Sequence, residues 1–138
     1  MTRNDHADSI IYGYINPPGG HLEVGETVVD TAKREAEEEM GVKNLMDIEV
    51  KGIVNVNGFK DVPVLMFVIT AEVSDSETPT KHEEGTPIWV NIDTLKTHKV
   101  LKDVEKIIKL VQKTPPGKMF HAASKFENRK LISFNVLN

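Results

Sequence analysis

The segment from Gly20 to Val42 constrains the fold more than any other part of the chain. It follows a Pro17-Pro18-Gly19-Gly20 turn and predicts a helix with readable ends. Thr27, followed three residues later by Asp30, is a capping-box-like start, and Gly41 is a left-handed C-terminal stop. The apolar residues between these ends recur at helical spacing, so we expect one face of the helix to pack on a core.

The glutamates near the end of this predicted helix are not equivalent. Glu35, Glu38 and Glu39 fall along one border of the apolar stripe, whereas Glu37 points to the far side. Carboxylates that repel one another beside a buried face destabilise the fold unless a cation lies between them, and hard divalent cations take oxygen ligands. Mg²⁺ is the natural candidate and Mn²⁺ the second. Arg34, one turn before Glu38, is placed to orient that carboxylate.

Most isolated glutamate-rich runs are solvated helix faces, but the spacing here is specific. Gly20 is followed after five residues by Glu26, then after seven more by Arg34-Glu35-Ala36, Glu38-Glu39 and Gly41-Val42. This pattern resembles the Nudix box, the motif of the Nudix hydrolase family. Its seven fixed identities, at roughly 6% average usage each, match a given position by chance on the order of 10⁻⁸ to 10⁻⁹.

The resemblance implies roles for individual residues. Glu38 and Glu39 would be direct metal ligands, joined by the backbone carbonyl of Gly19. Glu35 would bind metal or help to activate water, and Arg34 would fix the glutamate geometry. Mg²⁺ bound in this way neutralises charge on the phosphate oxygens during attack by water.

Other candidate residues lie around this set. Glu26 is expected to hold the loop against the helix and not to take part in catalysis. In members of the family that cleave nucleoside triphosphates, a downstream carboxylate often completes the metal site. Glu84 is the first candidate and Glu83 the next, with a solvated acidic loop as the alternative. Phe59 and Trp89 are candidates for stacking a nucleobase, although a lone aromatic such as Trp89 is more often part of a core.

The resemblance implies a Mg²⁺-dependent hydrolase of nucleoside diphosphate-linked compounds. The residues after the box, Asn57-Gly58-Phe59, lack the proline associated with ADP-ribose hydrolases and the tyrosine associated with diadenosine polyphosphate hydrolases. Elimination favours the MutT-like group, which cleaves nucleoside triphosphates, including 8-oxo-dGTP, to the monophosphate and pyrophosphate. ADP-ribose or another dinucleotide is the alternative substrate. A non-catalytic nucleotide-binding module and an inactive truncated fragment are the alternative functions.

The 138 residues fit a single domain, spanning 1–138, and the resemblance implies an α/β/α sandwich with a mixed sheet. Only 18 residues precede Gly19, so we expect the usual N-terminal strand of the family to be missing. The true start then lies upstream, or another chain completes the sheet, which makes a homodimer plausible. The remaining pattern predicts strands at Ile10–Ile15, Met46–Val56, Val62–Val73 and Pro87–Val90, a helix at Leu101–Gln112 and a terminal hairpin around Glu127–Lys130, with the Val62–Val73 strand central in the sheet.

Composition narrows the class of partner. The net charge is −4 and no long basic stripe is evident, which argues against long nucleic acid and favours a small nucleotide substrate. The chain has no cysteine, so disulfides and thiolate metal sites are excluded. It has no apolar run of membrane length, and the expectation is a cytoplasmic protein that does not bind membranes.

Overall fold

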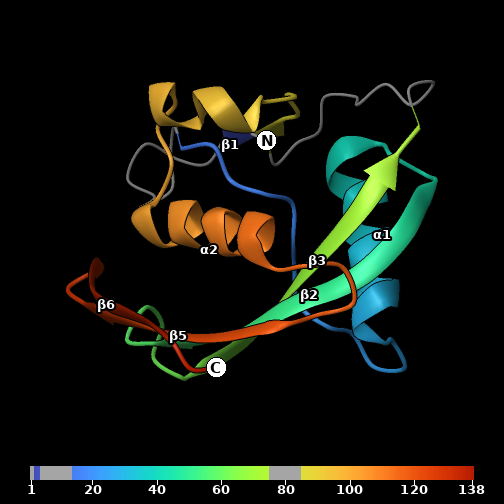
Figure 1. Cartoon of the computed structure of the whole chain (residues 1–138). Coiled ribbons are helices and arrows are strands. Elements are labelled where there is room, and N and C mark those ends of the chain that lie inside the picture. The colour runs from blue at the N-terminus through green and yellow to red at the C-terminus, as the bar shows by residue number, and fades with distance from the viewer. Residues whose placement is uncertain (1, 4–13, 75–84) are drawn as a thin grey trace. The chain divides into compact units, whose positions relative to one another are not determined.

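The computed structural model describes residues 2–3, 14–74 and 85–138 of this α/β protein (Figure 1). The elements, in chain order, are β1 (Thr2–Arg3), α1 (Val28–Met40), β2 (Leu45–Asn57), β3 (Val64–Val73), β4 (Gly85–Thr86), the 3₁₀ helix η1 (Ile92–Thr97), α2 (Lys102–Lys113), β5 (Phe120–Glu127) and β6 (Lys130–Val136).

The chain divides into two compact units, and the first contains Met1–Ile48 and Ala71–Leu101. In this unit β1 pairs antiparallel with β4, and Ile15 forms an isolated parallel bridge to Val100. Beside this bridge the Lys99 ammonium lies 4.4 Å from the centre of the Tyr14 ring, a cation–π contact. α1, with the loop before it, belongs to the same unit and carries the candidate site.

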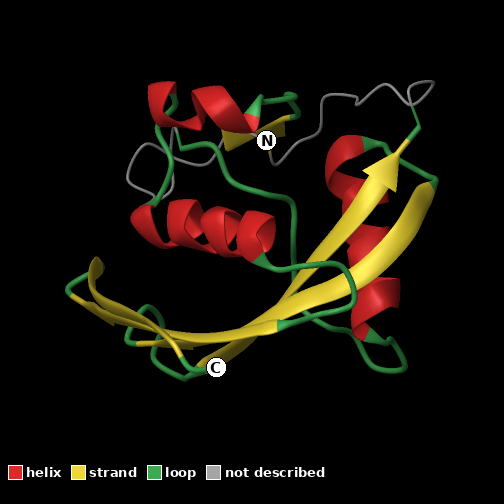
Figure 2. Ribbon diagram, in the orientation of Figure 1, coloured by secondary structure: helices red, strands yellow, loops and turns green. Residues whose placement is uncertain are grey.

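The second unit, Glu49–Thr70 and Lys102–Asn138, contains most of the main sheet. The four strands lie in the order β3-β2-β5-β6, with β2 parallel to β5 and β5 antiparallel to β6. Figure 2 shows α2 running along one face of the β5 and β6 part of this sheet, and it packs against both strands. The predicted α/β class with a mixed sheet is thus confirmed.

The core of the second unit forms between α2 and the sheet. Its buried members are Val54 on β2, Ile107 on α2, and Phe120 and Ala122 on β5. Gly52 is required for this packing because a Cβ there would overlap the Phe120 ring. Burial of these apolar side chains supplies the main stabilisation of the unit, at about 25 cal/mol per Å² removed from water.

A buried lysine fixes the connection from α2 to β5. Lys51 is only 5% exposed, and its Nζ donates to the Pro115 carbonyl oxygen at 2.9 Å. Two residues earlier on β2, Glu49 Oε1 accepts from the Gly117 backbone N–H at 2.8 Å. Both bonds tie β2 to the turn after α2, so the return of the chain into β5 is held at two points.

Several predicted elements are confirmed. The predicted strand Met46–Val56 is β2, the helix Leu101–Gln112 is α2, and the terminal hairpin is the β5–β6 pair. Asn128 and Arg129 form the hairpin turn, both with positive φ, at 50° and 64°.

The strand predicted at Val62–Val73 is confirmed as β3, but its predicted central position was wrong, and the strand predicted at Pro87–Val90 was wrong. The Val62–Val73 strand begins at Val64 and lies at an edge of the described sheet, not in its centre. Its continuous apolar run is compatible with either position, so the pattern alone could not decide. Pro87–Val90 is not a strand, because β4 ends at Thr86 and Pro87 has no N–H to continue the ladder.

Only part of the predicted N-terminal strand lies within the described residues. Residues 10–13 of the predicted strand Ile10–Ile15 lie outside the described residues, and Ile15 forms the single bridge given above. The missing N-terminal strand stays a prediction.

Candidate active site

The helix that carries the site begins and ends where the sequence predicts. Thr27 Oγ1 accepts from the Asp30 N–H at 3.1 Å, and Asp30 Oδ2 accepts from the Thr27 N–H at 2.9 Å, which completes a capping box. These bonds, led by the one from the Thr27 backbone, lower the pKa of Asp30. At the other end Gly41 is left-handed, with φ of 71°, and donates to the Ala36 and Glu37 carbonyls. Both ends of α1 are therefore capped by residues that lie next to the helix in the sequence.

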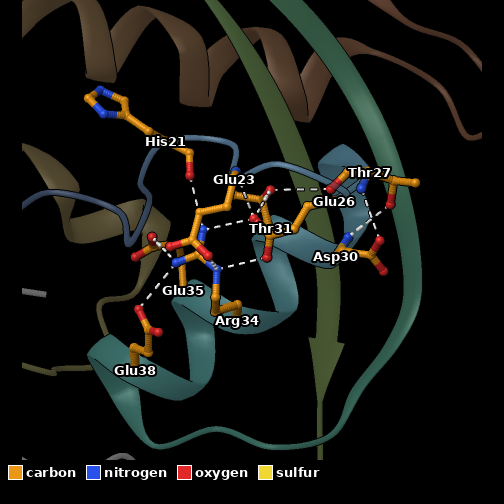
Figure 3. Close-up of polar contacts among 9 residues, drawn as sticks. All are labelled: His21, Glu23, Glu26, Thr27, Asp30, Thr31, Arg34, Glu35 and Glu38. Atoms are coloured by element: carbon orange, nitrogen blue, oxygen red, sulfur yellow. Dashed lines mark hydrogen bonds and ion pairs between the residues drawn. The ribbon is translucent and has the colours of Figure 1, made fainter.

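Arg34 is the centre of the polar network, as Figure 3 shows. Its guanidinium binds Glu26 through two bonds, from Nε to Oε2 at 2.8 Å and from Nη2 to Oε1 at 3.0 Å. Nη1 donates to Glu35 Oε1 at 2.7 Å and to Glu38 Oε2 at 3.3 Å. Nη2 also donates to the His21 carbonyl at 3.0 Å. The bonds to Glu26 and then Glu35 raise the pKa of Arg34, so the side chain stays a cation.

Glu26 joins the loop to the helix. Besides binding Arg34, its Oε1 accepts from the Glu23 backbone N–H at 2.9 Å and from Thr31 Oγ1 at 3.1 Å. The Arg34 hydrogen bonds, with the Glu23 N–H second, lower the pKa of Glu26 to about 2. All these partners lie in the loop or on α1, which supports the structural role predicted for Glu26.

The three candidate ligands of α1 differ in exposure. The Glu35 side chain is 13% exposed and that of Glu38 is 54% exposed, while Glu39 is buried at 2%. Glu39 Oε2 accepts from the Gly19 backbone N–H at 2.9 Å, so the turn before the box is bound to the last turn of α1. Gly20 lies so close that a Cβ there would overlap the Glu35 carboxylate. Gly19 therefore contacts Glu39, and Gly20 lies against Glu35, while the predicted metal contact of the Gly19 carbonyl stays a prediction.

The donor set fits a hard divalent cation in its chemistry. Glu35, Glu38, Glu39 and the Gly19 carbonyl offer only oxygen, the ligand type that Mg²⁺ prefers. In the described residues no group of three or more His, Asp or Glu side chains is gathered closely enough to hold a metal. Instead, the Arg34 cation lies between Glu35 and Glu38 and offsets their repulsion.

The two candidate aromatic residues differ in their surroundings. Trp89 is 66% exposed, against the usual core position of a lone tryptophan. Phe59 belongs to the second unit and is half-buried, with its ring packed edge-to-face on Phe126 at a centroid distance of 5.0 Å. Glu84 and Glu83 lie outside the described residues.

One residue of the network, Thr31, was not predicted from the sequence. Thr31 is buried at 8%, and its hydroxyl donates to Glu26 and to the Thr27 carbonyl. Its spacing in the sequence could have indicated this contact, because a threonine four residues after an N-cap is placed to donate a hydrogen bond to the carbonyl of the cap residue.

A model of the NUDIX domain matches residues 2–111. No curated protein matches the chain. Among solved structures, the crystal structure of a mutator MutT protein from Bacillus halodurans has a similar fold, with a TM-score of 0.77 and 23% identity over 90% of this chain and 82% of that one.

The chain therefore belongs to the NUDIX domain family. It is an enzyme, a pyrophosphohydrolase acting on phosphoric anhydrides, as its family indicates. Within the described ranges, neither α1 nor α2 is long and apolar enough to cross a membrane.

Proposed function

We propose that this chain is a Mg²⁺-dependent nucleoside triphosphate pyrophosphatase of the MutT-like kind, which releases a nucleoside monophosphate and pyrophosphate. The observation that carries the proposal is the grouping of Glu35 and Glu38 around Arg34, with Glu39 bonded to Gly19. The similarity of the fold to that of a mutator MutT protein supports this group, and 8-oxo-dGTP is the first substrate to test.

Each residue has a defined task in this proposal. Glu38 and Glu39, with the Gly19 carbonyl, hold the metal, and Glu35 binds metal or accepts a proton from the attacking water. Mg²⁺ supplies charge neutralisation on the phosphate oxygens, with Mn²⁺ as a substitute. Arg34 positions Glu35 and Glu38, and Glu26 fixes Arg34.

Recognition of the base is assigned to aromatic stacking. Trp89 presents an exposed ring, which supports a stacking role, whereas Phe59 already uses part of its ring on Phe126. Glu84 is proposed to complete the metal site.

The test is a turnover assay with a matched pair of variants. Release of pyrophosphate is measured with excess Mg²⁺ and with chelator, on the ordinary and 8-oxo deoxynucleoside triphosphates, ADP-ribose and diadenosine polyphosphates. Glu38→Gln should lose about 10²-fold or more of the rate, because a charged ligand is removed from phosphoryl transfer. Glu37→Gln, on the exposed opposite side of the same helix, should retain it.

The alternatives make different predictions in the same assay. A non-catalytic nucleotide-binding module would bind the nucleotides without turnover in the wild type. Preferential cleavage of ADP-ribose or another dinucleotide would replace the triphosphate proposal but keep the enzyme class.

A further inference from the structure

Arg34 uses its whole guanidinium within the site. It makes five hydrogen bonds, as many as a guanidinium has N–H donors, and Figure 3 shows their acceptors on the loop and on α1. Nε and Nη2 bind Glu26, and Nη2 also binds the His21 carbonyl. Nη1 divides its two N–H groups between Glu35 and Glu38. The guanidinium is therefore anchored on several sides and cannot follow one moving carboxylate without breaking its other bonds.

The bond to Glu38 is the weakest of the five. It is 3.3 Å long, whereas the bond from the same nitrogen to Glu35 is 2.7 Å, and charge-assisted N–O bonds usually measure about 2.7–2.9 Å. The Glu38 side chain is 54% exposed, against 13% for Glu35 and 17% for Glu26, so water competes for its oxygens. Exposed ion pairs of this kind contribute little to stability. Glu38 is thus the partner that Arg34 loses most easily.

Glu35 and Glu38 share one positive group. They lie three residues apart on α1, so their carboxylates are neighbours on the helix surface, and both reach Nη1. The single charge of Arg34 also serves Glu26, so it offsets the repulsion among three carboxylates only in part. A divalent cation carries twice that charge and binds carboxylate oxygens directly. Because such a cation and the guanidinium repel each other, its binding favours breaking the weakest Arg34 bond, the one to Glu38.

We propose that Glu38 exchanges one positive partner for another. Arg34 Nη1 holds Glu38 until a divalent cation binds, and Glu38 then leaves Arg34 to become a metal ligand, while Arg34 keeps its bonds to Glu26 and Glu35. The inference rests on the proposed function and adds how its metal site is maintained before the metal arrives. Arg34 both stabilises the acidic border of α1 without metal and competes with the metal for Glu38.

Nitrogen NMR of the arginine side chains measures this exchange during a Mg²⁺ titration of the full chain. The chain contains three arginines, Arg3, Arg34 and Arg129, so the Arg34 signals can be assigned individually. The Nη1 signal should shift as Mg²⁺ is added, because this nitrogen loses Glu38. The Nε signal should stay in place, because its partner is Glu26. Titration calorimetry on the same sample establishes independently whether the cation binds.

Two controls connect the shift to Glu38. In Glu38→Gln the ion pair is absent from the start, so the Nη1 signal should differ from that of the wild type without metal and should not shift further with Mg²⁺. Glu105 and Lys109 on α2 also form an i, i+4 ion pair, with a bond of 3.1 Å and a Lys109 side chain that is 52% exposed. The Lys109 Nζ signal should stay unchanged when the ionic strength is held constant, which separates the exchange from general screening.

The outcomes distinguish this inference from the proposed function. Calorimetric binding of Mg²⁺ together with a shift confined to Nη1 and to the wild type supports the exchange. Binding with an unchanged Nη1 signal, or with the same shift in Glu38→Gln, would overturn the exchange and leave the metal site intact. Failure of both Mg²⁺ and Mn²⁺ to bind would overturn the metal site itself, and the exchange with it.

Discussion

Substitutions of Glu39 can distinguish its structural role, as the acceptor of the Gly19 N–H, from its proposed role as a metal ligand. Glu39 is 2% exposed, and its carboxylate accepts the Gly19 N–H at 2.9 Å. Glu39→Ala removes this acceptor and leaves a partly buried donor without its charged partner. Because hydrogen bonds to charged groups contribute about 1.5–3 kcal/mol, we expect the free energy of unfolding to fall by that amount in metal-free buffer. Glu39→Gln keeps an oxygen acceptor and should lose only about 1 kcal/mol.

Magnesium then distinguishes the two tasks. A ligand that binds only the folded chain stabilises it by about 2.7 kcal/mol at a hundredfold excess over its dissociation constant. The wild type should gain stability with Mg²⁺ in this way, whereas Glu39→Gln should gain much less, because it has lost a charged ligand. The assay is urea unfolding followed by circular dichroism, with and without Mg²⁺.

The control is Glu37→Ala, an exposed change on the same helix that should stay within about 0.5 kcal/mol of the wild type. If Glu39→Ala destabilises the chain no more than this control, Glu39 does not anchor the Gly19 turn. If Mg²⁺ stabilises Glu39→Gln as much as the wild type, Glu39 is not a metal ligand.

Three further predictions address the rest of the site. Gly20→Ala should lower turnover by about 10²-fold with little change in stability, because its Cβ displaces the Glu35 carboxylate; steady-state kinetics checks this. Glu26, whose pKa falls from 4.5 to about 2, stabilises the fold above pH about 4.5 and loses that contribution as the pH falls towards 2. Glu26→Gln should therefore flatten the pH dependence of urea unfolding in this window. Gly41→Ala should lower the free energy of unfolding by about 1–2 kcal/mol, because φ is 71° there; thermal unfolding measures it.

Each of these predictions has a clear contrary result. Leu22→Ala, an exposed loop change beside Gly20, should leave turnover unchanged; an equal loss would refute the Glu35 explanation. An unchanged acid slope in Glu26→Gln would show that Glu26 does not set it. A neutral Gly41→Ala would argue against the left-handed C-cap.

The ends of α1 were predictable because their determinants are local. Thr27 and Asp30 are three residues apart, and Gly41 follows directly on the helix, so the sequence alone contains the whole capping geometry. The contacts of Arg34 were only partly predictable. Its i, i+4 partner Glu38 follows from helical spacing, whereas its bonds to Glu26 and His21 depend on how the loop folds back.

The position of β3 could not be predicted for a different reason. An unbroken apolar strand satisfies the pattern of a covered central strand and that of an open edge equally well. Only the strand order of the described sheet reveals which applies, and that order depends on distant pairings, such as β2 with β5, about 70 residues apart. Similarly, nothing local in the sequence shows that Phe59 packs on Phe126.

The bond between Gly19 and Glu39 joins residues twenty positions apart and so holds the turn before the box on α1, which has a consequence for ligand binding. Ordering a loop costs conformational entropy, and the cost is incurred when the chain folds, before any ligand arrives. Because the Gly19 turn is already fixed on α1, a phosphate ligand need not order this turn as it binds. The affinity of the site for its ligand is then set by charge and contact more than by the entropy of arranging the loop.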